Sequence, residues 1–163
     1  MSHPRRPARI AAGLAFASAA VSAYWTLGGT RLLDTVGGAI EDLARDRSPG
    51  ALALGATTVV LKAAAGLLAL ELGRRPGRRL VRVANGLVSA ILCLWGGANV
   101  VVGALVLSGV IHPSGEIDRH ALRWHVFVWD LWFLLWGVTL ALALATSRRA
   151  ITPAKTRTTP FDG

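Results

Sequence analysis

A lysine lies inside a long apolar segment of this chain. Residues 55–73 read GATTVVLKAAAGLLALELG, and Lys62 is near the middle of the run. A cation at the centre of a bilayer costs about 2.5–3.5 kcal/mol, so it is expected to be paired, solvated or bound to a ligand. At helical spacing, small residues share its face: Ala51, Gly55, Thr58, Ala65, Gly66, Ala69 and Gly73. Because small residues let helices approach closely, we expect Lys62 to face other helices.

Three further polar residues are candidates for the same intramembrane site. Asp130 lies six residues after Trp124 in the last apolar segment, and Asp34 lies in a loop. Asn99 belongs to a polar arc on the third apolar segment, formed by Asn85, Ser89, Gly96, Asn99 and Gly103. Asp130 and Asp34 are alternative ion-pair partners for Lys62. The interpretations left open are a structural ion pair, a site for a ligand, ion or proton, and simple snorkelling of Lys62 to the interface.

The last apolar segment also carries a stripe of aromatic residues with one histidine. Regular helical arithmetic puts His125, Trp129, Trp132 and Trp136 about 130° away from Asp130. This spacing predicts that Asp130 faces inward and that the tryptophans form a belt against lipid or another subunit.

The sequence predicts no catalytic residue, no metal ligand and no cofactor site. It has no nucleophile beside a base, no glycine-rich phosphate loop and no paired carboxylates within one apolar segment. His112, His120 and His125 crowd one loop and helix start, but their spacing matches no established metal site. These observations lean away from an enzyme and leave the question open.

The elements that position these residues are four apolar segments. The chain has 163 residues, is 53% hydrophobic and has a mean hydropathy of +0.48. Segments at about 10–28, 49–72, 82–110 and 122–146 are each long enough to cross about 30 Å of hydrocarbon. We therefore predict an all-α integral membrane domain over residues 10–147, with four transmembrane helices in an antiparallel bundle. A short amphipathic helix is expected at the interface between spans one and two, where Leu32, Val36 and Leu43 follow helical spacing.

The charges predict the orientation of this bundle. The net charge is +9, and most cations lie before the first span, between the second and third, and after the fourth. The other two loops mix cations with acidic residues, so residues 1–9 and a disordered basic tail, 148–163, are predicted to be cytoplasmic. The basic charge is therefore a topology signal, and no nucleic-acid partner is expected. Arginine-rich, alanine-rich composition indicates a bacterial plasma membrane.

The first apolar segment has an alternative interpretation as a secretory signal peptide. Its basic start and the small residues Val21, Ser22 and Ala23 fit a cleavage site that would remove residues 1–23. Tyr24 and Trp25 extend the segment in the way of an interfacial anchor, which favours a retained span.

Two stretches carry a resemblance to a known family. YWTLGGTRLLDTVGG at 24–38 and RWHVFVWDLWFLLWG at 123–137 resemble small bacterial membrane proteins catalogued as domain of unknown function thirty-nine ninety-five. The resemblance covers roughly residues 10–147 and implies four spans and a retained first segment, but no activity, cofactor or catalytic residue. It also places Asp34 and Asp130 inside motifs. Members often have proline after the aspartate; Leu131 here predicts an uninterrupted helix.

The sequence thus predicts a polar intramembrane site around Lys62, Asn99, Asp130 and Asp34 that takes a small ligand or a proton. The alternative is a non-catalytic assembly partner in which the Lys62–Asp130 pair is structural. The bilayer is the expected surrounding, and a homo-oligomer or another membrane protein stays open as a partner.

Overall fold

The computed structural model describes residues 5–115 and 117–151, with side chains to residue 148, and this part of the chain contains helices and no strand. The helices are α1 (Arg5–Thr26), α2 (Gly38–Asp46), α3 (Pro49–Arg74), α4 (Arg79–Leu107), α5 (Arg119–Trp124), the π-helical turn η1 (His125–Trp129) and α6 (Asp130–Ile151). The last three follow one another without a break. The predicted all-α class is therefore confirmed, while residues 1–4 and most of the predicted tail lie outside the described residues.

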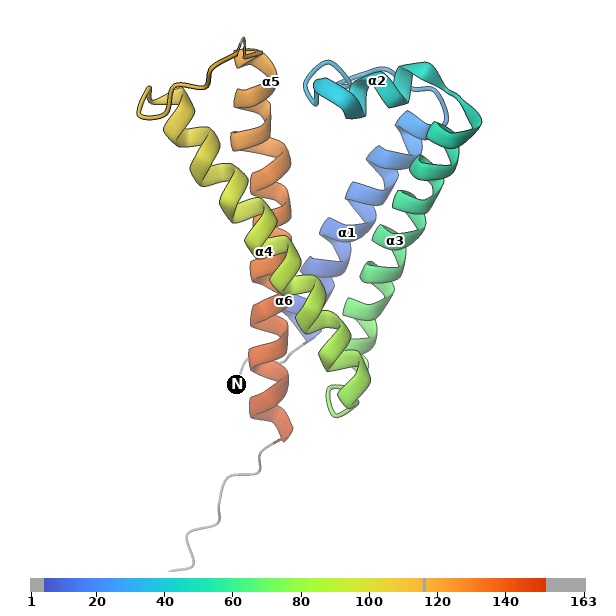
Figure 1. Cartoon of the computed structure of the whole chain (residues 1–163). Helices are drawn as coiled ribbons and strands as arrows, with labels where there is room; N and C mark the ends of the chain where they lie inside the picture. The colour runs from blue at the N-terminus through green and yellow to red at the C-terminus, as the bar shows by residue number, and fades with distance from the viewer. Residues whose placement is uncertain (1–4, 116, 152–163) are drawn as a thin grey trace, which may run out of the picture.

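The long helices form two pairs that diverge from one end of the molecule. Helix α1 packs along α3, and α4 packs along α6. In Figure 1 the two pairs come together at the lower end and spread apart toward the end where α2 and α5 lie. The contacts that join the pairs include a bond from Trp132 Nε1 to the carbonyl of Leu14 at 3.1 Å and the packing of α3 against α4 and α6.

Small residues allow the close approach within each pair. The α1–α3 interface consists largely of buried alanine and glycine: Ala8, Ala11, Ala12, Ala15, Ala65, Gly66, Ala69 and Gly73. In the second pair, Gly96 lies against the backbone of α6, and Ser89 Oγ donates to the carbonyl of Gly137 at 2.8 Å. The stripes predicted on α3 and α4 thus do face neighbouring helices, as small residues permit.

Three of the helices have the length and apolarity of a membrane span. They are α3, α4 and the continuous helix Arg119–Arg148. Helix α1 is not among these three, because it begins with Arg5, Arg6 and Arg9 and ends with Tyr24, Trp25 and Thr26, which lower the mean hydropathy of its apolar middle. The first predicted span, residues 10–28, therefore corresponds to a helix that packs closely on α3 and is less apolar than the other three.

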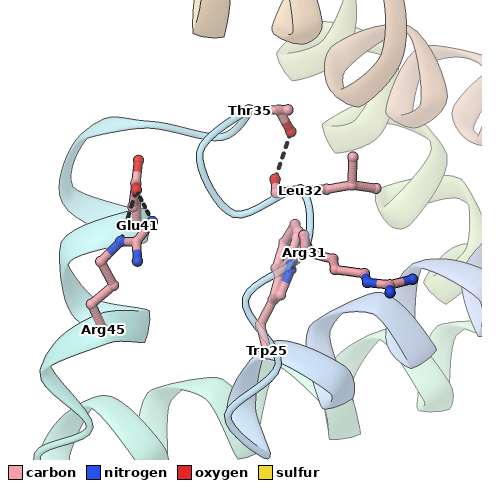
Figure 2. Close-up of polar contacts among 6 residues, drawn as sticks. All are labelled: Trp25, Arg31, Leu32, Thr35, Glu41 and Arg45. Atoms are coloured by element: carbon pink, nitrogen blue, oxygen red, sulfur yellow. Dashed lines mark hydrogen bonds and ion pairs between the residues drawn. The ribbon is translucent and has the colours of Figure 1, made fainter.

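The loop between α1 and α3 contains a short helix, as predicted, but only in its second half. Helix α2 begins only at Gly38, because Gly37 and Gly38 take φ of 63° and 56°, a conformation that glycine adopts without strain. The preceding residues form turns: Thr35 Oγ1 donates to the carbonyl of Leu32 at 2.6 Å, and Trp25 Nε1 donates to that of Arg31 at 3.0 Å (Figure 2). Leu33, Thr35 and Val36 are buried within these turns. The loop is therefore folded inward instead of lying flat as one helix.

One buried asparagine gives a stability prediction. The Nδ2 of Asn85, which is 1% exposed, donates to the carbonyls of Leu68 on α3 at 3.0 Å and Val81 at 2.8 Å. Asn85→Leu is expected to lower the free energy of unfolding in detergent micelles by about 1 kcal/mol, because this link between helices is lost. Asn99→Leu is the matched control, since the Nδ2 of Asn99 donates within its own helix to Trp95. Equal losses in the two variants would contradict this role for Asn85.

Candidate functional site

A cavity of about 370 Å³ lies between the two helix pairs, in the half of the molecule near α2. It is lined by α1, α2, α3, α4, η1 and α6, and most of its wall is aliphatic or aromatic. Its polar lining residues include Ser22, Thr58, Lys62, Asn99, His125 and Asp130. Three of the four predicted site residues, Lys62, Asn99 and Asp130, thus lie on the wall of one cavity. The fourth, Asp34, is exposed in the loop and is not one of the lining residues.

The ammonium of Lys62 is held by a hydroxyl and an aromatic ring. Its Nζ donates to Ser22 Oγ on α1 at 2.8 Å and lies 5.4 Å from the centre of the Phe133 ring on α6. Both contacts stabilise a cation, the second through the negative face of the ring. Within the described residues, no ion pair joins Lys62 to Asp130 or to Asp34. The predicted direct pair is therefore not formed in this structure.

Asp130 instead pairs with His125. Its Oδ2 lies 3.0 Å from His125 Nδ1, and the other ring nitrogen, Nε2, lies 2.8 Å from the carbonyl oxygen of Val36. A carbonyl can only accept, so Nε2 carries a proton, and the short Nδ1–Oδ2 contact needs a second proton between its atoms. Whether that proton belongs to the imidazole or to the carboxyl, the pair as a whole is neutral. Asp130 is 5% exposed, and neutrality lowers the cost of burying it.

The π-helical turn brings this pair together. In η1 the N–H of Asp130 bonds the carbonyl of His125, five residues back, so the two side chains lie one above the other. In a regular α-helix, residues five apart point in different directions, which is why the sequence placed them on separate faces. The predicted uninterrupted helix is thus continuous, but it changes its hydrogen-bond pattern at this point. The five-residue spacing of His125 and Asp130 indicates a contact between them only once the π turn is known.

The same turn fastens the folded loop to the cavity. Trp129 Nε1 donates to Thr35 Oγ1 at 3.1 Å, and the Trp129 ring meets Trp25 edge to face with centroids 5.4 Å apart. Together with the bond from His125 to Val36, these contacts fix residues 35 and 36 against η1. The loop therefore forms one wall of the cavity.

The predicted tryptophan belt is wrong for most of its members. Trp129 bonds the loop, Trp132 bonds α1, and Trp136 is 3% exposed in the core. Trp132 and Trp136 face the bundle because α6 packs against α4 and also against α1, so more than one of its faces is covered. Sequence reasoning therefore missed the inward roles of Trp129 and His125, and it missed Ser22 because a serine among alanines carries no distinctive signal.

The structure now defines a class of protein. It is an all-helical chain with three helices long and apolar enough to cross a membrane, and these are the features of a membrane protein.

The family follows from the sequence comparisons. Residues 15–140 match the profile of the family described as "Protein of unknown function (DUF3995)", and the chain belongs to this family. Every residue that lines the cavity lies within the matched range. No curated protein and no solved structure matches the chain.

Proposed function

We propose that this is an integral membrane protein of four spans whose cavity binds a small ligand from the outer side of a bacterial plasma membrane. The observation that carries the proposal is the cavity itself, which gathers Lys62, Asn99 and Asp130 from three different helices among apolar walls. A concave, mainly apolar pocket with a few convergent polar groups is the usual form of a ligand site. In the bilayer, a lysine placed there is a functional residue by default.

The fourth span is α1, although it is less apolar than the others. It runs beside α3 over most of its length (Figure 1), and its alanines are buried against that helix. A helix that covers so much of its surface with a neighbour needs less apolar surface of its own toward lipid. This position supports a retained first segment over a cleaved signal peptide.

The charge distribution orients the protein. Arg5, Arg74 and Arg75 lie at the end where the helix pairs converge. The opposite end carries acidic side chains, which include Asp34, Glu41, Asp42, Asp46 and Asp118. By the positive-inside rule the converging end and both termini are cytoplasmic, so the cavity opens outward.

The geometry favours ligand binding over the other interpretations. A proton site built on the His125–Asp130 pair is disfavoured, because both ring nitrogens of His125 are already bonded, one to Asp130 and the other to the carbonyl of Val36. An assembly partner was predicted to use the small-residue and tryptophan faces. Gly96, Gly137 and Trp136 are occupied inside the fold, so those faces serve the bundle itself.

Cysteine labelling tests the outward opening. The native Cys93 is first replaced by alanine, and single cysteines are introduced as Thr58→Cys in the cavity wall and Leu67→Cys on the exposed, lipid-facing side of α3. In cells or right-side-out vesicles, a charged thiol reagent that does not cross membranes is expected to modify the first variant and leave the second unmodified.

Ser114→Cys in the predicted outer loop is the positive control for access. If Ser114→Cys reacts while Thr58→Cys does not, the cavity does not open outward. If Gly77→Cys, in the turn between α3 and α4, reacts in place of Ser114→Cys, the orientation is reversed.

A further inference from the structure

We propose that the ligand of this cavity is a single-chain anionic amphiphile, with its carboxylate or phosphate head on Lys62 and its acyl chain leaving toward the bilayer. This inference rests on the proposed function and names the chemical class of its ligand.

The first step is the charge of the cavity. Among the described lining residues, the ionisable side chains are those of Lys62, His125 and Asp130. The last two form a neutral unit, because the carbonyl of Val36 requires a proton on Nε2 and the contact with Asp130 requires another. Lys62 is therefore the source of net charge in the cavity, and the complementary ligand is an anion.

The second step is the capacity of the ammonium. An ammonium has three N–H donors. Among the described residues, one donor of Lys62 reaches an acceptor, the hydroxyl of Ser22. The remaining N–H groups of Lys62 form their strongest hydrogen bonds with the charged oxygen of a carboxylate or phosphate. Asn99 lines the same cavity and offers a further amide group to the head.

The third step is the apolar wall. The side chains that line the cavity beyond this polar group are mainly aliphatic and aromatic, so a bare inorganic anion would leave them uncovered. Leu54 and Trp95 line the cavity and are also 55% and 64% exposed, so the cavity reaches the lipid-facing surface beside α3 and α4. A chain that leaves the cavity past either side chain ends in hydrocarbon. A volume of about 370 Å³ favours one chain over two.

Tryptophan quenching measures this binding directly. The protein in phosphatidylcholine nanodiscs is titrated with a brominated fatty acid, whose bromines quench nearby indoles; Trp25 and Trp129 line the cavity. We expect saturable quenching in the wild type, and dissociation constants raised at least about tenfold in Lys62→Met, since a bond to a charged group is lost. Lys62→Arg keeps the charge and is expected to retain most of the affinity. A thermal unfolding transition in each variant shows that it is folded.

The controls separate the parts of the proposal. The brominated alcohol of the same chain length is expected to bind the wild type as weakly as the acid binds Lys62→Met. If the wild type binds the acid and the alcohol equally well, the proposal that the cavity recognises an anion is wrong. Competition by inorganic phosphate as strong as that by the unbrominated acid overturns the need for a chain. Stronger quenching by a brominated phosphatidylglycerol than by the acid overturns the single-chain assignment. If these tests fail while Thr58→Cys is still labelled from outside, the anionic amphiphile is rejected as the ligand. The proposal of an outward-opening binding cavity is then retained.

Discussion

Gly96→Ala is expected to lower the free energy of unfolding by about 2–3 kcal/mol, a large effect for one methyl group. A Cβ at Gly96 would lie 2.6 Å from the backbone nitrogen of Leu134 and 2.7 Å from the carbonyl oxygen of Asp130. Both contacts are with the backbone of α6, which cannot rotate away as a flexible side chain can. The methyl group must therefore push α4 and α6 apart at the level of the cavity.

Gly97→Ala is the matched control for this change. It adds the same methyl group one residue later, where the nearest atom is Leu134 Cδ1 at 3.8 Å, an ordinary contact. The two variants have the same helix propensity and the same composition. Unfolding by heat or by sodium dodecyl sulfate in mixed micelles measures the difference between them. A loss in Gly96→Ala no larger than that in Gly97→Ala would show that α4 and α6 do not meet as closely as the structure has them.

Gly96→Ala is also expected to weaken ligand binding in the cavity. The oxygen that a Cβ at Gly96 would strike belongs to Asp130, whose side chain lines the cavity. A shift of this backbone segment changes the distance between Asp130 and His125. We therefore expect the Gly96→Ala protein that remains folded to bind the anionic amphiphile more weakly than Gly97→Ala.

The helices that are regular could be predicted in detail from the sequence. On α3 and α4 an advance of about 100° per residue holds throughout. The stripe around Lys62 is accordingly buried at Ala65, Gly66 and Ala69, and the polar arc on α4 is buried at Asn85 and Ser89. These assignments needed only the identity and spacing of small residues. Lys62 and Asn99 also lie on the wall of one cavity, a result that depends on how the helices are arranged.

The partner of Lys62 could not be predicted, because it depends on an irregular helix. The π turn at His125–Trp129 shifts the phase of everything after it, and the sequence pattern gives no sign of the shift. Asp130 consequently turns to His125, and Ser22 takes the place that a carboxylate was expected to fill. Asp34 was the alternative partner of Lys62 because of its place in the loop, yet the turns stabilised by Thr35 and Gly37 leave it exposed. Local backbone geometry decided both outcomes.

The second large effect is expected at the neutral pair. Asp130→Ala should lower the free energy of unfolding by about 3 kcal/mol, because His125 loses the acceptor that lets it keep a proton in a part-buried position. With the imidazole displaced, the bond to the carbonyl of Val36 is lost, and the loop loses one of its links to η1. Trypsin cleavage after the exposed Arg31 is therefore expected to become faster, which limited proteolysis followed by mass spectrometry detects.

A double-mutant cycle distinguishes this pair from the Lys62–Asp130 pair that the sequence suggested. The double variant His125→Leu/Asp130→Leu is expected to lose less stability than the sum of the two single variants, with a coupling energy of about 1–3 kcal/mol. The reason is that the second substitution removes a side chain that has already lost its partner. Lys62→Met combined with Asp130→Leu is expected to be additive within about 0.5 kcal/mol, because the ammonium bonds Ser22 and not the carboxylate. A larger coupling in the second cycle than in the first would mean that Asp130 serves Lys62 in the bilayer. It would also reduce the net charge of the cavity to that of His125 and take away the argument for an anionic ligand.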